Sequence, residues 1–474
     1  MDLHSEHRSP ERGIFCNRTL NLMAIKAIGF DMDYTLIHYR TDEWERRAYE
    51  HIQKKLLADG WPVANLIFDP KAMVRGLILD LERGNILKCN RFGYAKRAAH
   101  GTRMLGYEET RLTYSRTVVD LAEPRFEFLN TLFSISEAAI YAQLVDLLDS
   151  GQLPTGLGYA ALYQKVRRCL DEAHMEGELK AEIVGNPEKY VELDPDLPTA
   201  LLDMVDAGKR LLLITNSEWE YTQPMMAYAF DRFLPPGLTW RDLFEVTILS
   251  ARKPAFFSSR MPLFELVEDS ALYRPTVSGL KPKGIFLGGD ASHVERYLKL
   301  SGEEILYVGD HVFVDVHMSK NVLRWRTALV LHELEAELVA IDAFSHQRRQ
   351  LESLMGRKED MEVVLNRTKV MISRLQHGRP QVSNEPIEVL QTRASELKSK
   401  IRLLDTEIGP LAKANDELGN ERWGPLMRAG NDKSHLARQV ERYADIYMGR
   451  VSNFMALTPY AYVRSPRGSL PHDS

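Results

Sequence analysis

The sequence has few cysteines and no long apolar run, and both shortages exclude classes of protein. Its three cysteines, Cys16, Cys89 and Cys169, lie far apart, so they predict neither a disulfide framework nor a zinc site. No apolar run approaches the roughly 20 residues that a membrane span needs. The opening stretch, MDLHSEHRSPERG, lacks the apolar segment of a signal peptide. We therefore expect a cytoplasmic protein in a reducing compartment.

The sequence also lacks a strong excess of charge. Its 61 Lys and Arg residues nearly balance 66 Asp and Glu residues, for a net charge of −5, which gives no support to a nucleic-acid or membrane partner. With 44% hydrophobic and 27% charged residues, the composition is that of a soluble globular protein. At 474 residues, the chain is too long for one compact domain, so we expect about two or three.

Residues 25–36, IKAIGFDMDYTL, are the stretch around which the predicted fold is organised. The apolar run before Asp31 is typical of a strand buried on both faces of a parallel sheet. Asp31 and Asp33 then lie at the carboxyl end of the strand, where open α/β sheets bind ligands. Two such carboxylates repel each other unless a cation or proton lies between them. Mg²⁺ and phosphate fit this need, although an Asp-x-Asp pair alone is also common in surface loops and helix caps.

Three further segments carry polar side chains in matching places. Residues 209–217, KRLLLITNS, and residues 304–315, EILYVGDHVFVD, are short buried-strand patterns, and ARKP at 251–254 lies between them. Strands that alternate with helical stretches predict an α/β fold with a doubly wound parallel sheet. Each motif alone is an ordinary turn or surface lysine, but their order along the chain is not expected by chance. The candidate side chains are Thr215, Asn216, Lys253, Asp310 and Asp315.

The whole set meets the needs of phosphoryl transfer through an aspartyl phosphate. Asp31 is the predicted nucleophile, and Asp33 the acid that protonates the leaving oxygen and then the base that deprotonates water. Thr215 and Asn216 would donate hydrogen bonds to the phosphoryl oxygens, and Lys253 would offset the negative charge.

The same residues predict a magnesium site. Asp31, Asp310 and Asp315, together with the backbone carbonyl of Asp33, would supply an oxygen shell for Mg²⁺. The predicted cofactor is therefore Mg²⁺.

The strand at residues 25–30 and the next one are widely separated in sequence, which predicts an inserted cap over the site. We expect the cap at 41–184, with a β-hairpin near 76–88, and the catalytic core at 17–40 and 185–335. Helical patterns lie at 41–59, 137–149 and 159–177.

Two apolar stripes in residues 336–474 predict a C-terminal helical region that packs on the core and takes part in oligomer contacts. The second stripe has alternating spacings of 4 and 3, typical of a coiled-coil seam. A long antiparallel helical hairpin and two separate amphipathic helices are both compatible with it. The stripes comprise Phe344, Leu351, Leu354, Met361, Leu365, Ile372 and Leu375, and then Leu390, Ala394, Leu397, Ile401, Leu404, Ile408 and Leu411.

The order of the motifs resembles the haloacid dehalogenase (HAD) superfamily of phosphatases. The longer strings FDMDYTL, LNTLF, ITNS, ARKP-x-FF and LYVGDHVF-x-D resemble the cytosolic purine 5′-nucleotidase family, of the type that prefers IMP and GMP. The resemblance extends from about Asn17 through WGPLMRAG and RYADIYMGRVSNF to the closing PHDS. It implies a HAD-like core and Mg²⁺-dependent hydrolysis of purine nucleoside 5′-monophosphates.

The resemblance also implies roles for residues of the cap. Arg167 and Asp171 would read a 6-oxopurine, because the guanidinium can donate to O6 and the carboxylate can accept from N1, a pattern that adenine reverses. The spacing of Arg167, Asp171 and His174 puts them on one helix face, which from the residues alone favours a solvated surface, and the resemblance reverses that interpretation. The implied nucleotide-binding set is Phe133, Arg167, Asp171, His174 and Lys180. The sequence departs from relatives at Ser134 and Met175, where they carry asparagine and tyrosine.

Some relatives are activated by ATP-like effectors, and Asn130, Phe313 and Lys320 are present at the corresponding region. Two alternatives to a nucleotidase stay open: a nucleoside phosphotransferase that uses the same phosphoenzyme, and a nucleotide-binding scaffold with incidental hydrolysis. The predicted partners are purine nucleoside monophosphates and further copies of the chain, as a dimer or tetramer.

Overall fold

The structure, a computed structural model, describes residues 9–175, 177–267, 272–276, 278–380, 385–466 and 468, without the side chains of 173–175. It consists of two compact units. Residues 1–335 and 426–474 form the first unit, and residues 336–425 form the second. Each unit has buried apolar clusters of its own.

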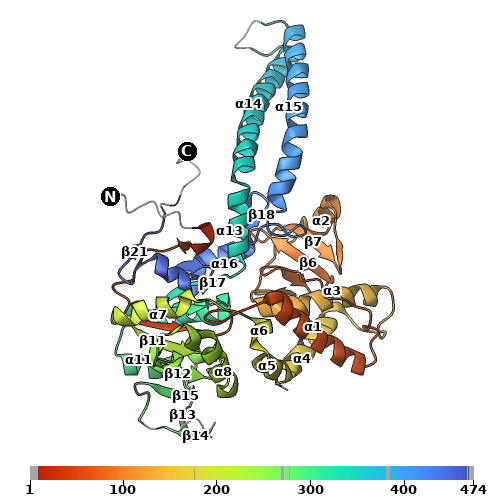
Figure 1. Cartoon of the computed structure of the whole chain (residues 1–474). Coiled ribbons are helices and arrows are strands. Elements are labelled where there is room, and N and C mark those ends of the chain that lie inside the picture. The colour runs from red at the N-terminus through yellow and green to blue at the C-terminus, as the bar shows by residue number, and fades with distance from the viewer. Residues whose placement is uncertain are drawn as a thin grey trace. The chain divides into compact units, whose positions relative to one another are not determined.

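The first unit is built on a sheet of ten strands that is parallel through its centre (Figure 1). Antiparallel strands lie only at its two edges, so the predicted α/β fold with a doubly wound parallel sheet is confirmed. In spatial order the strands are β1 (Ile14–Cys16), β20 (Ile446–Met448), β17 (Arg326–Val330), β16 (Ile305–Gly309), β3 (Ala27–Phe30), β11 (Arg210–Ile214), β12 (Val246–Leu249), β15 (Gly284–Gly288), β13 (Leu263–Val267) and β14 (Leu272–Pro275).

All four residues of β3 are buried, as the apolar pattern of the sequence predicts. Apolar side chains of β3, β11, β12 and β16 share one cluster with Phe256, Val294 and Trp325, which covers one face of the sheet. The helices of this part are α7 (Asp196–Asp206), α8 (Trp219–Phe230), α9 (Trp240–Leu243), α10 (Ala255–Ser258), α11 (Ala291–Leu298), α12 (Met318–Leu323) and α16 (His435–Tyr443).

The inserted residues form a second, antiparallel sheet with helices around it. The chain enters and leaves this region through a two-stranded ribbon of β4 (His38–Tyr39) and β10 (Val191–Glu192). The sheet order is β8 (Arg103–Met104), β7 (Ala95–His100), β6 (Asn85–Cys89), β5 (Ile78–Asp80) and β9 (Phe126–Phe128). β5 and β6 pair antiparallel, in the stretch where the sequence predicts a β-hairpin.

The helices of the insertion agree with the sequence pattern. The three predicted helical stretches correspond to α1, α3 and α4. The helices are α1 (Thr41–Ala58), α2 (Tyr107–Tyr114), α3 (Ile135–Asp149), α4 (Tyr159–Met175), α5 (Glu178–Gly185) and α6 (Pro187–Tyr190). None of the described helices combines the length and apolar character of a membrane span.

The second unit is a helical hairpin. Helices α14 (Ser345–Gln376) and α15 (Ile387–Asp416) run antiparallel side by side (Figure 1). Leu354 packs against Leu404 and Ile408, and Lys358 Nζ lies 2.6 Å from an Asp405 oxygen. Of the two arrangements compatible with the stripes, the structure has the hairpin, in which the apolar stripe of one helix packs against the other.

The predicted C-terminal region 336–474 needs a correction, because the structure divides it. Residues 426–474 belong to the first unit, where β20 pairs with β17 and β1 inside the main sheet. A strand of three residues is too short to show an alternating pattern, so the sequence pattern did not reveal it.

Candidate active site

The sheet register brings the predicted acids to one edge. Phe30 of β3 is paired with Val308 of β16 and with Leu213 of β11. The Asp31 amide then donates to the Val308 carbonyl (2.9 Å), and the Thr215 amide donates to the Ile248 carbonyl (2.9 Å). Since β16 ends at Gly309, the residues that follow all three strands meet at the same carboxyl edge.

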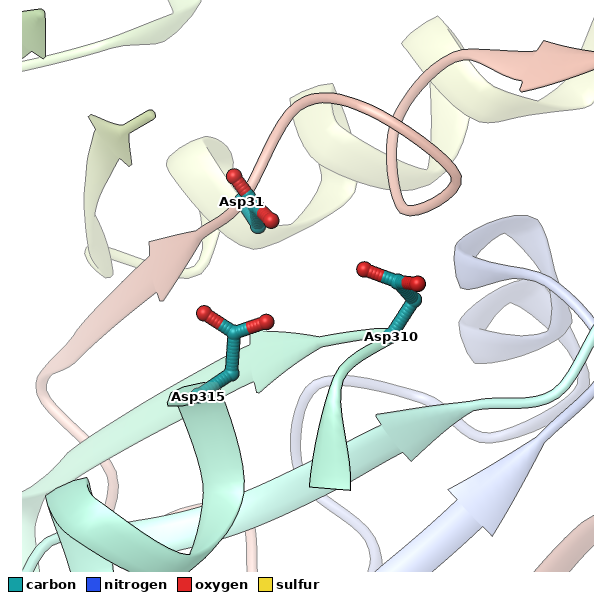
Figure 2. Close-up of side chains that lie close together, drawn as sticks. All are labelled: Asp31, Asp310 and Asp315. Atoms are coloured by element: carbon teal, nitrogen blue, oxygen red, sulfur yellow. The ribbon is translucent and has the colours of Figure 1, made fainter. Parts of the chain in front are cut away.

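Three carboxylates converge at this edge (Figure 2). One oxygen each from Asp31, Asp310 and Asp315 lie within 4.8 Å of one another. The Asp310 and Asp315 residues are 4% and 1% exposed, and Asp310 Oδ2 is a buried oxygen without a hydrogen-bond donor. A buried, unpartnered carboxylate oxygen is costly, and a hard cation with oxygen ligands relieves that cost. The donor set fits Mg²⁺.

Glycine at position 309 permits the close approach of Asp315. A Cβ on Gly309 would lie 2.5 Å from Asp315 Cβ, which no side chain tolerates. Asp315 stands on a short π-helix, η5 (Val312–His317), and its Oδ2 accepts from the His311 amide (3.2 Å). His311 Nδ1 accepts from the Val314 amide (3.1 Å), and burial lowers the His311 pKa to about 3, so the neutral ring caps this helix.

Lys253 is the cation of the site. Its Nζ lies 2.7 Å from Asp31 Oδ1 and 2.8 Å from Asp315 Oδ1. The Lys253 side chain is 1% exposed. Burial opposes its charged form, but Asp31 and Asp315 hold the pKa of Lys253 well above its usual value. Lys253 therefore stays protonated and orients Asp31, whose Oδ1 also accepts from the Met32 amide (2.8 Å).

Two further contacts hold Lys253 in place. Its Nζ donates to the Tyr307 hydroxyl (3.1 Å), which in turn donates to the Ile214 carbonyl (3.1 Å). The Tyr307 ring crosses β3 over Gly29, where a Cβ would be 2.9 Å from the ring. The Lys253 backbone amide donates to Asn216 Oδ1 (2.7 Å), and Asn216 Nδ2 donates to the Lys253 carbonyl (3.3 Å). Asn216 thus fixes the lysine, and its predicted contact with phosphate stays a prediction.

The negative charge of the cluster exceeds what one lysine offsets. Burial raises the pKa of Asp31 to about 6, with Lys253 lowering it and Asp315 raising it. Burial also raises the pKa of Asp310 well above its usual value. Because both pKa values are raised, Asp31 and Asp310 can be ionised together only if a further positive charge lies near them.

Asp33 lies apart from the three converging acids. Its Oδ1 accepts from the Tyr39 hydroxyl and its Oδ2 from the Ser217 hydroxyl (2.8 Å). Burial raises the Asp33 pKa, while the positive charge of Lys180 opposes the shift. A carboxyl group with a raised pKa and two fixed hydrogen bonds suits proton transfer. Its carboxylate is not among the metal-ligating oxygens, and the predicted role of its backbone carbonyl stays a prediction.

Some of the predicted nucleotide-binding residues are brought near this edge. Phe133 lies edge-on to Tyr34, with ring centroids 4.7 Å apart, and Tyr34 is part of the loop that carries the acids. Lys180 Nζ is paired with Glu218 (2.9 Å) and lies 5.1 Å from the Tyr221 ring centroid. The Tyr221 hydroxyl is hydrogen-bonded to the Tyr39 hydroxyl (2.9 Å), the donor to Asp33, so Lys180 lies near the catalytic edge.

Arg167 and Asp171 lie on one face of α4, as predicted. Arg167 Nε is 4.0 Å from an Asp171 oxygen, and its Nη1 is 3.4 Å from Glu137 Oε1. The Tyr163 hydroxyl lies 3.2 Å from the same Nη1. The side chain of His174 lies outside the described part of the structure.

The predicted effector residues do not converge in the contacts that the structure describes. Phe313 packs edge-on against Phe128, with ring centroids 6.0 Å apart, while Lys320 Nζ is paired with buried Asp445. Asn130 is half-buried. The effector role of these residues stays a prediction.

The sequence prediction missed several residues of the site. Tyr307 is hidden in an apolar strand, and Tyr39 follows the catalytic loop without a motif of its own. Ser217 could have been found, because it directly follows Thr215 and Asn216 at the strand end. Glu137 also had a signal, as an acid within the apolar α3.

The chain is similar to known proteins over nearly its full length. A family model described as the 5′ nucleotidase family matches residues 14–474. A 5′-nucleotidase domain-containing protein of Dictyostelium discoideum is 26% identical over 469 residues, covering 97% of this chain and 74% of the relative. Human 5′-nucleotidase domain-containing protein 2 is 26% identical over 458 residues, covering 93% of this chain and 81% of the relative. These matches confirm the family that the motifs predicted.

Two solved structures are also similar to the chain. A β-phosphoglucomutase of Pyrococcus sp. strain ST 04 has a TM-score of 0.30 at 10% identity, covering 65% of this chain and 86% of its own. A predicted phosphoglycolate phosphatase of Haemophilus somnus has a TM-score of 0.29 at 14% identity, with coverages of 65% and 85%. Likeness at these TM-scores supports no argument about the site.

Proposed function

The chain belongs to the 5′ nucleotidase family and is a phosphoric monoester hydrolase; on this premise we propose that it hydrolyses purine nucleoside 5′-monophosphates, preferring IMP and GMP, with Mg²⁺ as cofactor. The observation that carries the proposal is the position of Lys253 between Asp31 and Asp315, beside the buried Asp310. A site that only binds nucleotides has no need of a carboxylate held in this way.

The proposed reaction runs in two steps. In the first, an Asp31 oxygen attacks phosphorus, the bond from phosphorus to the 5′ oxygen breaks, and Asp33 gives its proton to that oxygen as the nucleoside leaves. In the second, water attacks the phosphorus of the aspartyl phosphate while Asp33 takes a proton from it, and Asp31 is released with inorganic phosphate. Asp33 thus ends with the proton that it began with.

Mg²⁺ held by Asp31, Asp310 and Asp315 would supply positive charge against the phosphate oxygens when bound. Lys253 keeps Asp31 oriented and offsets its charge throughout. Thr215, which is fully buried at the same edge, and Asn216 are the proposed donors to the phosphoryl group.

Base recognition in this proposal belongs to α4. Arg167 would donate to purine O6 and Asp171 would accept from N1, while Phe133 would stack on the base. Support comes from the resemblance of the sequence and from the ion pair that already holds Arg167 beside Asp171. A cytoplasmic location and a homo-oligomer of two or four copies belong to the same proposal.

The test is phosphate release from IMP, GMP, AMP, UMP and an aryl phosphate, with Mg²⁺ and with EDTA. We expect IMP and GMP to be the best substrates, no turnover in EDTA, and no turnover by Asp31→Asn. Asp290→Asn is the control, because Asp290 is also an aspartate at low exposure but caps α11 away from the cluster. Substantial activity of Asp31→Asn would reject the nucleophile. Equal rates on UMP and IMP would reject purine selectivity, and an added inosine acceptor would reveal phosphotransfer.

A further inference from the structure

Arg75 reaches the acid cluster from the inserted region, although 235 positions separate it from Asp310. Its neighbour Gly76 fixes the backbone there. The Gly76 amide donates to the Leu129 carbonyl (2.7 Å), which extends the edge of the antiparallel sheet. Gly76 also has a φ of +89°, and a Cβ on it would lie 2.9 Å from Leu436 Cβ. Glycine is therefore required at position 76, and Arg75 is presented at a defined place.

The Arg75 guanidinium is held on two sides. Its Nη2 donates to Glu333 Oε2 (3.0 Å), and its Nε lies 2.5 Å from Glu333 Oε1. The remaining nitrogen, Nη1, donates to the backbone carbonyl of Asp310 (2.9 Å). The Arg75 side chain is 1% exposed. The Nη2 contact is a charge-assisted hydrogen bond and the Nε contact an ion-pair contact without hydrogen-bond geometry, so Glu333 holds the guanidinium on the side away from Asp310.

We propose that Arg75 is a positioning residue for Asp310 and thereby sets the affinity of the acid cluster for Mg²⁺; the inference rests on the proposed function. Asp310 is the first residue after β16, between the strand and η5. Its Oδ2 has no donor in the described structure, so the direction of its carboxylate depends on how its backbone is held. The hydrogen bond from Arg75 supplies that hold.

Arg75 contacts Asp310 through the backbone carbonyl and leaves its carboxylate to face the other two acids. Groups that orient a metal ligand from behind typically change metal affinity or activity by about 10- to 100-fold when they are replaced. We expect a change of this size at Arg75.

The experiment compares Arg75→Lys with Arg125→Lys. Lysine keeps the charge, but its single nitrogen cannot replace the two guanidinium nitrogens that donate to Glu333 and to the Asp310 carbonyl. Arg125 is the matched control, because it belongs to the same inserted region and pairs with buried Asp80 through two nitrogens, at 2.8 and 2.7 Å. A general weakening of the inserted region should appear in both variants.

The first measurement is calorimetric titration of each purified protein with Mg²⁺ alone, without nucleotide. We expect Mg²⁺ to bind Arg75→Lys about 10- to 100-fold more weakly than the wild type, and to bind Arg125→Lys as it binds the wild type. The Mg²⁺ concentration for half-maximal phosphate release should rise in parallel, with a smaller change in the rate at saturating Mg²⁺. Unchanged Mg²⁺ affinity in Arg75→Lys, or equal weakening in Arg125→Lys, would overturn the inference.

Glu333→Gln covers the case in which Arg75→Lys does not fold. It removes the ion pair that aims Arg75 but leaves the Arg75 side chain, so we expect a smaller weakening of Mg²⁺ binding in the same direction. Wild-type affinity in Glu333→Gln would then reject the inference. A wild type that binds Mg²⁺ but releases no phosphate would defeat the proposed function and leave the role of Arg75 to calorimetry. A wild type that binds no Mg²⁺ would defeat both.

Discussion

Replacing Lys253 by methionine should leave two buried carboxylates without their shared cation. Asp31 and Asp315 each lie within 2.8 Å of Lys253 Nζ, and methionine keeps most of the volume without the charge. Removing one partner of a buried ion pair typically destabilises a protein by about 3–5 kcal/mol. We expect a loss of that size in unfolding free energy at pH 8 in the absence of Mg²⁺.

The pH dependence of this loss follows from the sign of the Asp31 shift. In the folded protein, the pKa of Asp31 is about 6 even with Lys253 present. Removing Lys253 raises the pKa of Asp31 further, because Lys253 favours the ionised carboxylate. A carboxyl group whose folded pKa exceeds its unfolded pKa of about 4 binds more protons in the folded state. Its unfavourable effect therefore grows as the pH rises through this interval, so the Lys253→Met penalty should be smaller at pH 5 than at pH 8.

The assay is urea unfolding of the wild type and variant at pH 5 and pH 8, with and without Mg²⁺. Lys209→Met is the matched control, since Lys209 is a buried lysine whose amine donates to the Leu22 and Ile25 carbonyls and to no carboxylate. Its penalty should not depend on pH or Mg²⁺, whereas Mg²⁺ should restore part of the stability of Lys253→Met. Because Lys253 also orients the nucleophile, its loss should reduce kcat by roughly 10²- to 10³-fold.

The reasoning fails if Lys253→Met and Lys209→Met lose the same stability at both pH values. That result would mean that the acids beside Lys253 are not held ionised by it. It would also remove the electrostatic basis for Asp31 as a nucleophile.

Three further outcomes are expected. Asp33→Asn should slow phosphate release by roughly 10²- to 10⁴-fold, and acid quenching should show whether the phosphorylated protein accumulates. Gly309→Ala should push Asp315 away and weaken Mg²⁺ binding in calorimetry, and wild-type affinity would show that the Gly309 contact is dispensable. In metal-free protein, the unfolding free energy of the wild type relative to Asp31→Asn should fall by roughly 2–3 kcal/mol as the pH rises from 4 to 6, because ionising Asp31 is less favourable in the folded state. A difference in unfolding free energy that does not change with pH in urea unfolding would contradict the raised pKa of Asp31.

The catalytic edge could be predicted from the sequence because each of its motifs is local. Asp31 and Asp33 directly follow an apolar run, and Asp310 directly follows another, so strand ends and acids are visible together. Parallel strands place their carboxyl ends at one edge whatever the connections between them. Heptad spacing over many turns indicated two long helices in the regions of α14 and α15, but it left open whether they pack against each other.

The remaining parts depend on contacts between distant residues. Arg75 meets Asp310 only when the insertion folds onto the sheet, and nothing in the residues near Arg75 indicates this. Tyr307 acts through a hydroxyl at the tip of a side chain that an apolar pattern counts as core. The short strand β20 is specified by its neighbours β17 and β1, since three residues carry too little periodicity to be recognised.

The place of β20 has a practical consequence for the hairpin. The polypeptide leaves the first unit before α14 and returns to it after α15. The returning segment contributes β20, a strand inside the main sheet. Cleaving the backbone between α14 and α15 would therefore produce two fragments that share one sheet, with β20 of the second fragment hydrogen-bonded between β1 and β17 of the first. The gene could be divided there for co-expression, and a reporter could be inserted there. A stop codon before β20 would remove an interior strand and should yield insoluble protein.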